Sequence, residues 1–379
     1  MKKLLSIAVL AVLCFSAKAQ YNFSSVDSLL NAKLSTVFHN KVVCMVMHND
    51  SLVYYYHQGA DSTTTDDIAS CSKTFSAALM LRLAQDGTIR LNDSIAMYYP
   101  FTTGLGKGKI TLRQLFAHVS GLDGNTNYNA SNSITLQQSG DSILRNESLI
   151  YTPIGTKFSY TGEDQQAAGA AAEKAAGIAW HSLFKVKIAQ PLGLTNTTYT
   201  RTTAANPRIA GGISSNAADM MRFGQFILHN GENASGTQVV NAIRMQELWR
   251  DQTNHALQVN SPYPNSPTNN NPYGADTIYY GLGTWLDIYN PTHSYQEQIS
   301  GDGAFGAIIW VNRCTNTTGV FMTFAPTLYG TAYKTEYKAM DLIRAQFPFT
   351  CYTGISKLLP QAAKDKELQL QSMPNAADR

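Results

Sequence analysis

Beyond its first nineteen residues, the sequence lacks an excess of charge of either sign. The chain of 379 residues has 29 Lys and Arg against 26 Asp and Glu, but Lys2, Lys3 and Lys18 fall within that first segment, which contains no acid. Taking these three away leaves 26 basic residues against 26 acidic ones, with no basic block among them. Binding to nucleic acid depends on clustered Lys and Arg that neutralise phosphates. A nucleic-acid partner is therefore not expected.

The sequence also lacks the motifs of several large classes of enzyme. It has no His-Glu-x-x-His pair for zinc, no Walker loop for nucleotide phosphates, and no Gly-x-Ser-x-Gly turn that would present a nucleophilic serine. Its eight histidines are scattered, without the close Cys and His spacing of a zinc site. We interpret His118 as structural. No metal and no cofactor are expected.

Long apolar runs are absent apart from one, Leu4 to Phe15, whose roughly twelve residues fall short of the ~20 that a membrane-spanning helix needs. This run follows a basic start and precedes small residues, which is typical of a cleavable signal peptide, here residues 1–19. A membrane anchor and a lipid anchor on Cys14 are the alternatives. We expect export to the periplasm or the medium, with no membrane span left after cleavage.

Cysteines are few. Cys14 leaves with the predicted signal, and Cys44, Cys71, Cys314 and Cys351 remain. Four cysteines permit three pairings, and disulfides persist outside the cytoplasm. The first two lie in a strand-like run and at a helix start, where buried free thiols are expected. A bridge between the last two is possible, and the sequence leaves it open.

The hydrophobic pattern places strands at both ends of the chain and helices between them, so the sheet must be assembled from distant segments. Polar stretches at 123–139 and 252–277 are expected to be loops, the second near whatever the protein binds. The expected helices cover 25–38, 70–87, 110–122, 164–189, 216–229 and 331–347. The expected strands cover 41–50 and 51–59, as a hairpin, and 281–289, 304–312 and 319–326.

One pair of residues has the spacing of a serine nucleophile and its base. Ser70 and Lys73 are three residues apart, so a helix beginning at Ser70 would place both on one face. A serine hydroxyl needs a base to take its proton, and a lysine can serve if its surroundings lower its pKa. Ser182 and Lys185 repeat the spacing, with the lysine expected to be solvated. The alternative role for Ser70 is a helix N-cap.

The blocks around this motif are more specific than its spacing. The segment IASCSKTFSAALMLRLAQDGTIRLNDSI resembles the nucleophile segment of the serine β-lactamase and penicillin-binding-protein superfamily, in particular class C-type β-lactamases and related esterases. The later blocks ITLRQLFAHVSGL, PIGTKFSYTG, AAGAAAEKAAG, IAQPLGLTNTTY and GGISSNAADMMRFGQFIL resemble those of the family in the same order. The resemblance covers roughly residues 25–347 and implies that Ser70 is the nucleophile.

This resemblance also implies the architecture. We expect an α/β (α+β) fold, in which an antiparallel sheet is flanked by N- and C-terminal helices and joined to a mostly helical second subdomain, as in β-lactamases and transpeptidases. The domain is expected to cover residues 20–350, followed by a tail at 351–379.

The second motif of the family, Tyr-x-Asn, corresponds to Tyr160-Thr161-Gly162. The resemblance implies that Tyr160 is a general base for acylation, held partly ionised by a buried ammonium, and that it returns the proton to the leaving group. Gly162 departs from the family asparagine. Its side-chain amide, which could orient Lys73 or bind a substrate amide, is missing, and this puts amide substrates in doubt.

The third motif, Lys-Thr-Gly or His-x-Gly in the family, corresponds to Gly301-Asp302-Gly303. The resemblance implies that the next backbone N–H, that of Ala304, is the second oxyanion donor beside that of Ser70. Asp302 would repel a substrate carboxylate by a few kcal/mol, about the size of a charge contact near a protein surface, unless it is a solvated turn residue that points away. His229-Asn230-Gly231 matches His-x-Gly, but it ends a helix.

We therefore expect an exported serine hydrolase without metal or cofactor, acting through a Ser70 acyl-enzyme on a small-molecule ester, amide or peptide. An esterase or D-amino-acid amidase is favoured, because Asp302 and Gly301 replace the cation that holds a substrate carboxylate. A β-lactamase or DD-carboxypeptidase is the alternative within the class. The alternative from another class is a non-catalytic module that binds wall fragments or proteins. The sequence leaves the oligomeric state open.

Overall fold

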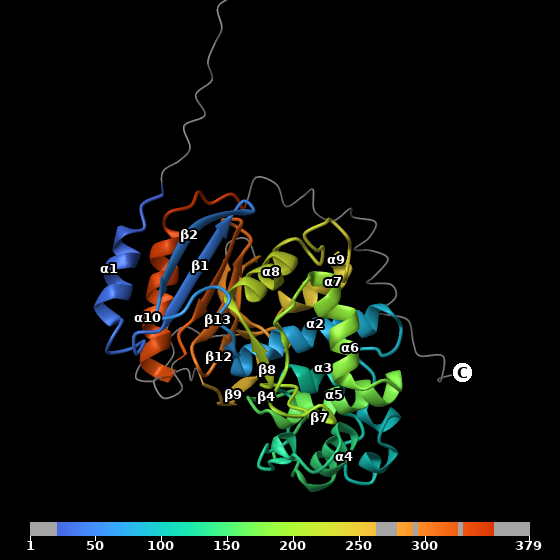
Figure 1. Ribbon diagram of the computed structural model, residues 1–379. Helices are drawn as coiled ribbons and strands as arrows, with labels where there is room; N and C mark the ends of the chain where they lie inside the picture. Colours follow the sequence, from blue (N-terminus) through green and yellow to red (C-terminus); the bar gives the residue numbers. More distant parts are fainter. Residues whose placement is uncertain (1–20, 263–278, 291–294, 325–328, 352–379) are drawn as a thin grey trace, which may run out of the picture.

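Strands from both ends of the chain meet in one sheet, as the computed structural model in Figure 1 shows. The structure describes residues 21–262, 279–290, 295–324 and 329–351. The predicted signal peptide, part of the 252–277 stretch and all but the first residue of the predicted tail lie outside this range. Within the described ranges no helix has the length and apolar character needed to cross a membrane.

The central sheet has seven strands in the order β10-β11-β12-β13-β14-β1-β2, and all neighbours are antiparallel. The predicted hairpin is confirmed, because β1 and β2 pair antiparallel. Asn49 and Asp50 at its turn both have a positive φ (47° and 61°), as in the tight turns that suit a hairpin. The bounds of the strands are Val42–His48 (β1), Ser51–Gln58 (β2), Tyr279–Tyr280 (β10), Trp285–Asn290 (β11), Tyr295–Gly303 (β12), Ala307–Asn312 (β13) and Thr317–Met322 (β14).

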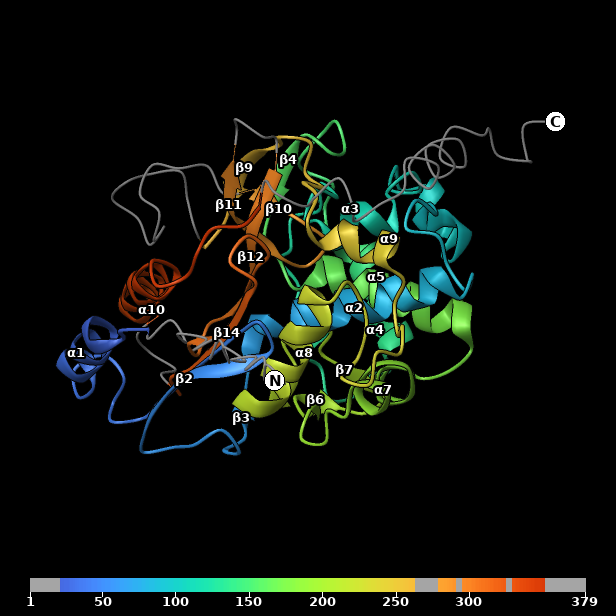
Figure 2. The same cartoon turned by 90° about the horizontal axis from the view of Figure 1, so that it is seen from above.

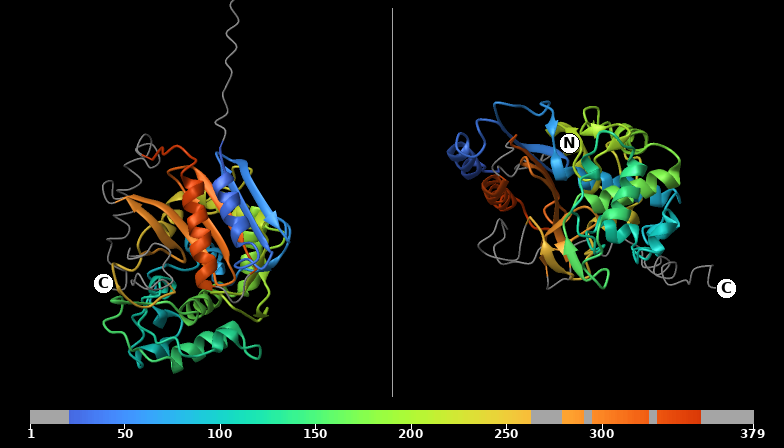
Figure 3. Two further views of the ribbon diagram at one scale, coloured as in Figure 1. Left: turned by 90° about the vertical axis from the view of Figure 1, so that its left-hand side faces the viewer. Right: turned by 90° about the horizontal axis from the view of Figure 1, so that it is seen from below.

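Two helices from opposite ends of the chain, α1 (Ser24–Lys33) and α10 (Tyr329–Arg344), lie side by side on one face of this sheet (Figures 1 and 3). Side chains alternate across a strand. In β13, accordingly, Ile308 and Trp310 pack with α10, while the intervening Ile309 packs in the core on the other face. The sheet is thus buried on both sides, and the predicted arrangement with terminal helices is confirmed.

The helical subdomain covers the opposite face (Figure 2). Its central helix, α2 (Ser72–Gln85), has twelve of its fourteen residues buried, so even its polar side chains are enclosed. The other helices are α3 (Leu112–Phe116), α4 (Leu136–Asn146), α5 (Glu163–Ala176), α6 (Trp180–Phe184), α7 (Gln190–Leu192), α8 (Ala217–Leu228) and α9 (Ala242–Met245). Short strands are β3 (Asp66–Asp67), β4 (Lys157–Ser159), β5 (Thr198–Tyr199), β6 (Thr202–Thr203), β7 (Asn206–Pro207), β8 (Ile213–Ser215) and β9 (Leu257–Asn260).

Several element predictions were wrong in detail. The helix predicted at 164–189 is interrupted after α5, where Gly177 adopts a left-handed φ of 64°. The stretch predicted as a loop at 123–139 already contains the start of α4, which Thr135 and Gln138 cap reciprocally. The predicted excursion at 252–277 includes β9, which pairs in parallel with β4. β9 has only four residues, too few to show a hydrophobic period, whereas α4 begins inside a polar stretch whose composition favours a loop.

Cys314 and Cys351, whose pairing the sequence left open, form a disulfide, and Cys44 and Cys71 are buried free thiols as expected. The bridge closes a segment of 37 residues that contains α10. Replacing both bridged cysteines by alanine is expected to lower the free energy of unfolding by about 2–4 kcal/mol, because the unfolded chain gains freedom. Urea unfolding with and without dithiothreitol tests this. Identical wild-type midpoints in the two conditions would contradict it.

Candidate active site

The first two candidate residues meet beside the sheet. Ser70 lies in a single 3-10 turn, Ala69–Cys71, that leads into α2, and the Nζ atom of Lys73 donates a hydrogen bond to Ser70 Oγ at 3.1 Å. The residue before the serine, Ala69, has a φ of +44°. Such backbone conformations are costly for residues other than glycine and concentrate at functional sites. The predicted spacing therefore brings hydroxyl and amine into contact, although the α-helix itself begins two residues later than expected.

Lys73 is enclosed, with a relative exposure of 3%. Its Nζ also donates to the Ala210 carbonyl oxygen at 2.9 Å and lies 4.4 Å from the centre of the Tyr160 ring. Burial lowers the pKa of Lys73 to about 7; the charge of Arg208 acts in the same direction and that of Glu163 opposes it. A large share of this amine is therefore neutral near pH 7, as a general base must be.

Tyr160 follows β4 and is held by β9. Its backbone N–H donates to the Asn260 carbonyl oxygen at 2.7 Å, and the Asn260 side-chain amide donates to the Tyr160 carbonyl oxygen at 3.1 Å. The ring stacks on Trp285, with centroids 5.3 Å apart, and lies 4.6 Å from the ring of His118. The tyrosine therefore has a fixed orientation toward the serine and lysine.

The ionisation of Tyr160 differs from the expectation. Burial raises the pKa of Tyr160 above its ordinary value, while a hydrogen bond with Ser70 acts in the opposite direction. The phenol thus stays protonated at neutral pH, so it suits the role of proton donor better than that of base. His118, expected to be structural, is fully buried, and burial together with Lys73 lowers its pKa.

The third motif lies at the end of β12, and its central residue faces away from the serine. A Cβ atom added to Gly301 would lie 2.3 Å from Thr74 Oγ1 of α2, and one added to Gly303 would lie 2.0 Å from the Ile68 carbonyl oxygen. Because side chains alternate along a strand, Asp302 points to the other face of the sheet. There it is buried, at 4% exposure, and accepts a hydrogen bond from Tyr337 Oη of α10 at 2.6 Å.

Both predictions for Asp302 were therefore wrong. Its carboxylate neither faces a substrate nor sits in a solvated turn, and its charge acts to raise the pKa of Tyr160. Asp302 is therefore not placed to repel a substrate carboxylate.

The two backbone N–H groups that the sequence predicts as oxyanion donors, those of Ser70 and Ala304, lie on neighbouring segments. In the turn that carries Ser70, the first backbone hydrogen bond is donated by the N–H of Cys71 to the Ile68 carbonyl oxygen. The N–H of Ser70 lies one residue before this donor. Ala304 follows the last β12–β13 residue pair, Gly303 with Ala307. Gly303 approaches Ile68 closely, since a Cβ atom added to the glycine would lie 2.0 Å from the Ile68 carbonyl oxygen, so the end of β12 contacts the turn that carries Ser70.

The two segments that repeat the motif spacings, Ser182 with Lys185 and His229 to Gly231, lie outside the site. Ser182 and Lys185 are both exposed, at the end of the helical subdomain that carries α6. His229 ends α8, and its Nε2 atom pairs with Asp50 at 2.7 Å on the surface.

Sequence reasoning missed three residues that line the site. Ala210 is the acceptor for Lys73. Arg208, partly exposed, has its Nε atom 3.9 Å from the Cβ position of Gly211, and the Ala69 carbonyl oxygen lies 3.8 Å from that same point. The third is Asn129, whose side-chain nitrogen lies 2.5 Å from the Cβ position of Gly162. No local motif marks these residues, because the fold brings them in from distant segments.

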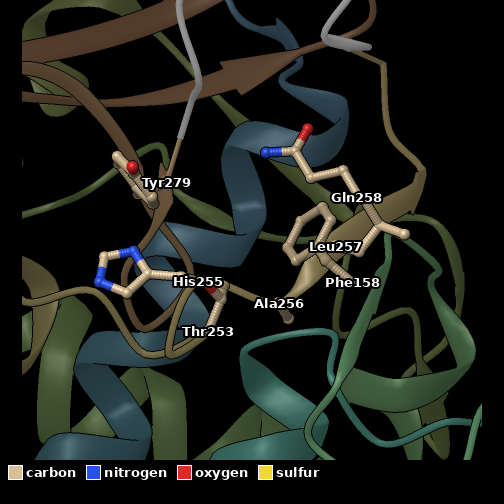
Figure 4. A pocket seen from close by; sticks show the side chains of 7 residues that line it. All are labelled: Phe158, Thr253, His255, Ala256, Leu257, Gln258 and Tyr279. Atoms are coloured by element: carbon tan, nitrogen blue, oxygen red, sulfur yellow. The ribbon is translucent and has the colours of Figure 1, made fainter.

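A recess of about 160 Å³ opens beside β9 (Figure 4). Its lining side chains come from β4, from residues 253–258 and from β10: Phe158, Thr253, His255, Ala256, Leu257, Gln258 and Tyr279. Phe158 lies 6.4 Å from the Tyr160 ring, so the recess adjoins the site. No serine or lysine in the part of the chain that the structure describes lines this recess, so Ser70 and Lys73 lie outside it. Among the described residues, no group of three His, Cys, Asp or Glu side chains could hold a metal ion.

A family model described as beta-lactamase matches residues 39–335, and the chain belongs to this family. Among curated proteins, "Protein flp" of Staphylococcus aureus (strain NCTC 8325) is 27% identical over 151 residues, which are 38% of this chain and 30% of that protein. The match thus spans less than a third of the relative.

Solved structures share the fold. A candidate β-lactamase from Bacteroides dorei has a TM-score of 0.73 and 24% identity, covering 85% of this chain and 99% of that one. A penicillin-binding protein homologue from Pyrococcus abyssi, an octamer, has a TM-score of 0.68 and 14% identity, covering 92% and 81%. EstCE1, a hydrolase with promiscuous acyltransferase activity, has a TM-score of 0.65 and 16% identity, covering 83% and 97%. At these identities the likeness defines the fold alone.

Proposed function

We propose that this protein is an exported serine hydrolase that cleaves an ester or amide through an acyl-enzyme on Ser70. The observation that carries the proposal is the buried Lys73 amine, with a pKa lowered to about 7, in hydrogen-bond contact with Ser70 Oγ. Membership of the β-lactamase family supports it. Export rests on the signal peptide predicted at residues 1–19.

The steps follow from the contacts. Neutral Lys73 accepts the Ser70 hydroxyl proton as Oγ attacks the substrate carbonyl carbon, and the N–H groups of Ser70 and Ala304 stabilise the resulting oxyanion. The bond to the leaving group then breaks, and that group takes a proton from the lysine ammonium directly or through the Tyr160 phenol. Water attacks the acyl-enzyme and gives a proton back to the lysine, and Ser70 Oγ departs with a proton.

A second candidate within the class, a β-lactamase or DD-carboxypeptidase, is favoured by Arg208. The orientation of Asp302 removes the expected repulsion, and the partly exposed guanidinium near Lys73 has no carboxylate within 4 Å among the described residues. A free arginine suits a substrate carboxylate.

Turnover of p-nitrophenyl esters and of nitrocefin, measured on wild type and Ser70→Ala, separates these candidates. Ser70-dependent ester turnover without nitrocefin turnover supports an esterase or amidase, and the reverse supports a β-lactamase. A protein that turns over neither, and that an acylating probe does not label, is the non-catalytic module.

The acylation rate is expected to rise with pH through about 7. Below that pH Lys73 is an ammonium and cannot accept the Ser70 proton; above it the amine is neutral. No falling limb is expected below pH 10, because the pKa of Tyr160 is raised. A profile of kcat/KM from pH 5 to 10 on a non-ionising ester tests this. A flat profile through pH 7 would contradict the role of Lys73 as the base.

A further inference from the structure

The side-chain position of Gly162 is already filled by another residue. Gly162 has φ −88° and ψ −26°, an ordinary right-handed conformation that any residue can adopt. A Cβ atom added there would nevertheless lie 2.5 Å from Asn129 Nδ2. In an asparagine, the amide nitrogen stands about 2.5 Å from its own Cβ, as bond lengths and angles dictate. The Asn129 amide nitrogen is therefore as far from this point as that of an asparagine at position 162 would be.

Asn129 is buried and has no partner of its own. Its relative exposure is 3%, and its side-chain amide makes no hydrogen bond to any other residue within the described ranges. Neither atom of this amide is among the fully enclosed polar atoms that lack a partner, so the amide is accessible although most of the residue is covered. An accessible, unpaired amide beside Gly162, two residues along the chain from Tyr160, can therefore bind a ligand group.

The segment that carries Asn129 is firmly held. The side-chain amide of buried Asn206 donates to the carbonyl oxygens of Tyr128 and Ser131, at 3.1 and 2.8 Å, and so clamps both sides of Asn129. Gln166 donates to Asn206 Oδ1 at 2.8 Å and accepts from Ile209 N at 2.9 Å.

This network ties Asn129 to the catalytic lysine. Ile209 is followed by Ala210, whose carbonyl oxygen accepts from Lys73 and whose Cβ lies 3.9 Å from the same Cβ position of Gly162. The amide is thus preorganised relative to the reacting groups, as a binding group should be.

We propose that Asn129 supplies, from a different segment, the side-chain amide that the second motif lacks, and that it binds an amide group in the acyl portion of the substrate. A side-chain amide offers a hydrogen-bond donor and an acceptor together, so it complements another amide. It can form no hydrogen bond with an alkyl chain. This inference rests on the proposed acyl-enzyme function. It reverses the sequence-based doubt about amide-bearing substrates, because the amide is present although its motif is not.

The test compares two esters with one leaving group. N-acetylglycine p-nitrophenyl ester carries an amide next to the scissile carbonyl, and p-nitrophenyl butyrate carries a methylene chain. Asn129→Ala is expected to lower the ratio of the two kcat/KM values by about tenfold to a hundredfold, the usual effect of losing a hydrogen bond to a buried polar group. Asn127→Ala, an exposed neighbour in the same segment, should keep the wild-type ratio. The ratio is independent of the fraction of folded enzyme in a sample.

A swap makes the test specific. Gly162→Asn alone should reduce turnover, because its side chain collides with Asn129. The double variant Asn129→Ala/Gly162→Asn should regain most of the ratio, since an amide returns to the same distance from the position 162 Cβ. An unchanged ratio in Asn129→Ala, or no recovery in the swap, overturns the inference. Failure of the proposed function is distinct: wild type would then show no Ser70-dependent turnover of either ester.

Discussion

Replacing Lys73 by methionine is expected to lower kcat/KM for ester hydrolysis by about 10²- to 10⁴-fold, the usual contribution of a positioned general base. Methionine keeps the length and apolar stem of the buried side chain, so packing around α2 should survive while the proton acceptor 3.1 Å from Ser70 Oγ is lost. Arginine at this position should not restore activity, because a guanidinium stays charged at any working pH. Steady-state kinetics on p-nitrophenyl esters measure the loss.

Lys185→Met is the matched control. Lys185 has the same three-residue spacing from a serine, but its side chain is exposed, whereas that of Lys73 is buried. Its replacement should leave kcat/KM at the wild-type value. Equal losses in the two variants, or no loss in Lys73→Met, would contradict the assignment of the base.

Replacing Gly303 by alanine is expected to damage both the fold and the site. The new methyl carbon would lie 2.0 Å from the Ile68 carbonyl oxygen, a backbone atom that cannot rotate away, so β12 and the turn carrying Ser70 must separate. Overpacking of this kind costs about 1–3 kcal/mol of unfolding free energy. The same separation moves the N–H of Ala304 away from that of Ser70, and losing one oxyanion donor costs about 10²- to 10³-fold in kcat.

Urea unfolding and kcat, corrected for the active fraction by titration with an acylating probe, measure the two effects separately. Gly104→Ala is the control, because Gly104 has an ordinary φ of −66° and its nearest neighbour, the Phe101 carbonyl oxygen, lies 3.7 Å from the new Cβ. Wild-type stability and kcat in Gly303→Ala would mean that β12 does not form the oxyanion hole.

The sequence was sufficient to predict the fold class and the contact between Ser70 and Lys73. Ordered motif blocks indicated the architecture, and Ser70 and Lys73 needed only one local turn to meet. The direction in which Asp302 points could not be predicted in the same way. A shift of one residue in the register of β12 exchanges the two faces of the sheet, and the register is set by the pairing with β13 rather than by the motif.

Asn129 escaped prediction for a different reason. It lies in a polar stretch with no hydrophobic period, and only the clamp from Asn206 and the approach of Gly162 give it a place. The sequence shows that position 162 has a glycine where the motif has an asparagine. It does not show which other side chain occupies the space of that asparagine. The same holds for Ala210, which acts through its backbone carbonyl and so leaves no signature in its side chain.

The acyl-enzyme proposal is tested most directly by labelling with a fluorophosphonate, which reacts with activated serines, followed by intact mass and peptide mapping. Wild type and Ser182→Ala should each gain one adduct, on Ser70, and Ser70→Ala should gain none. An adduct on Ser70→Ala, or no adduct on folded wild-type protein, would contradict the assignment of Ser70 as the nucleophile.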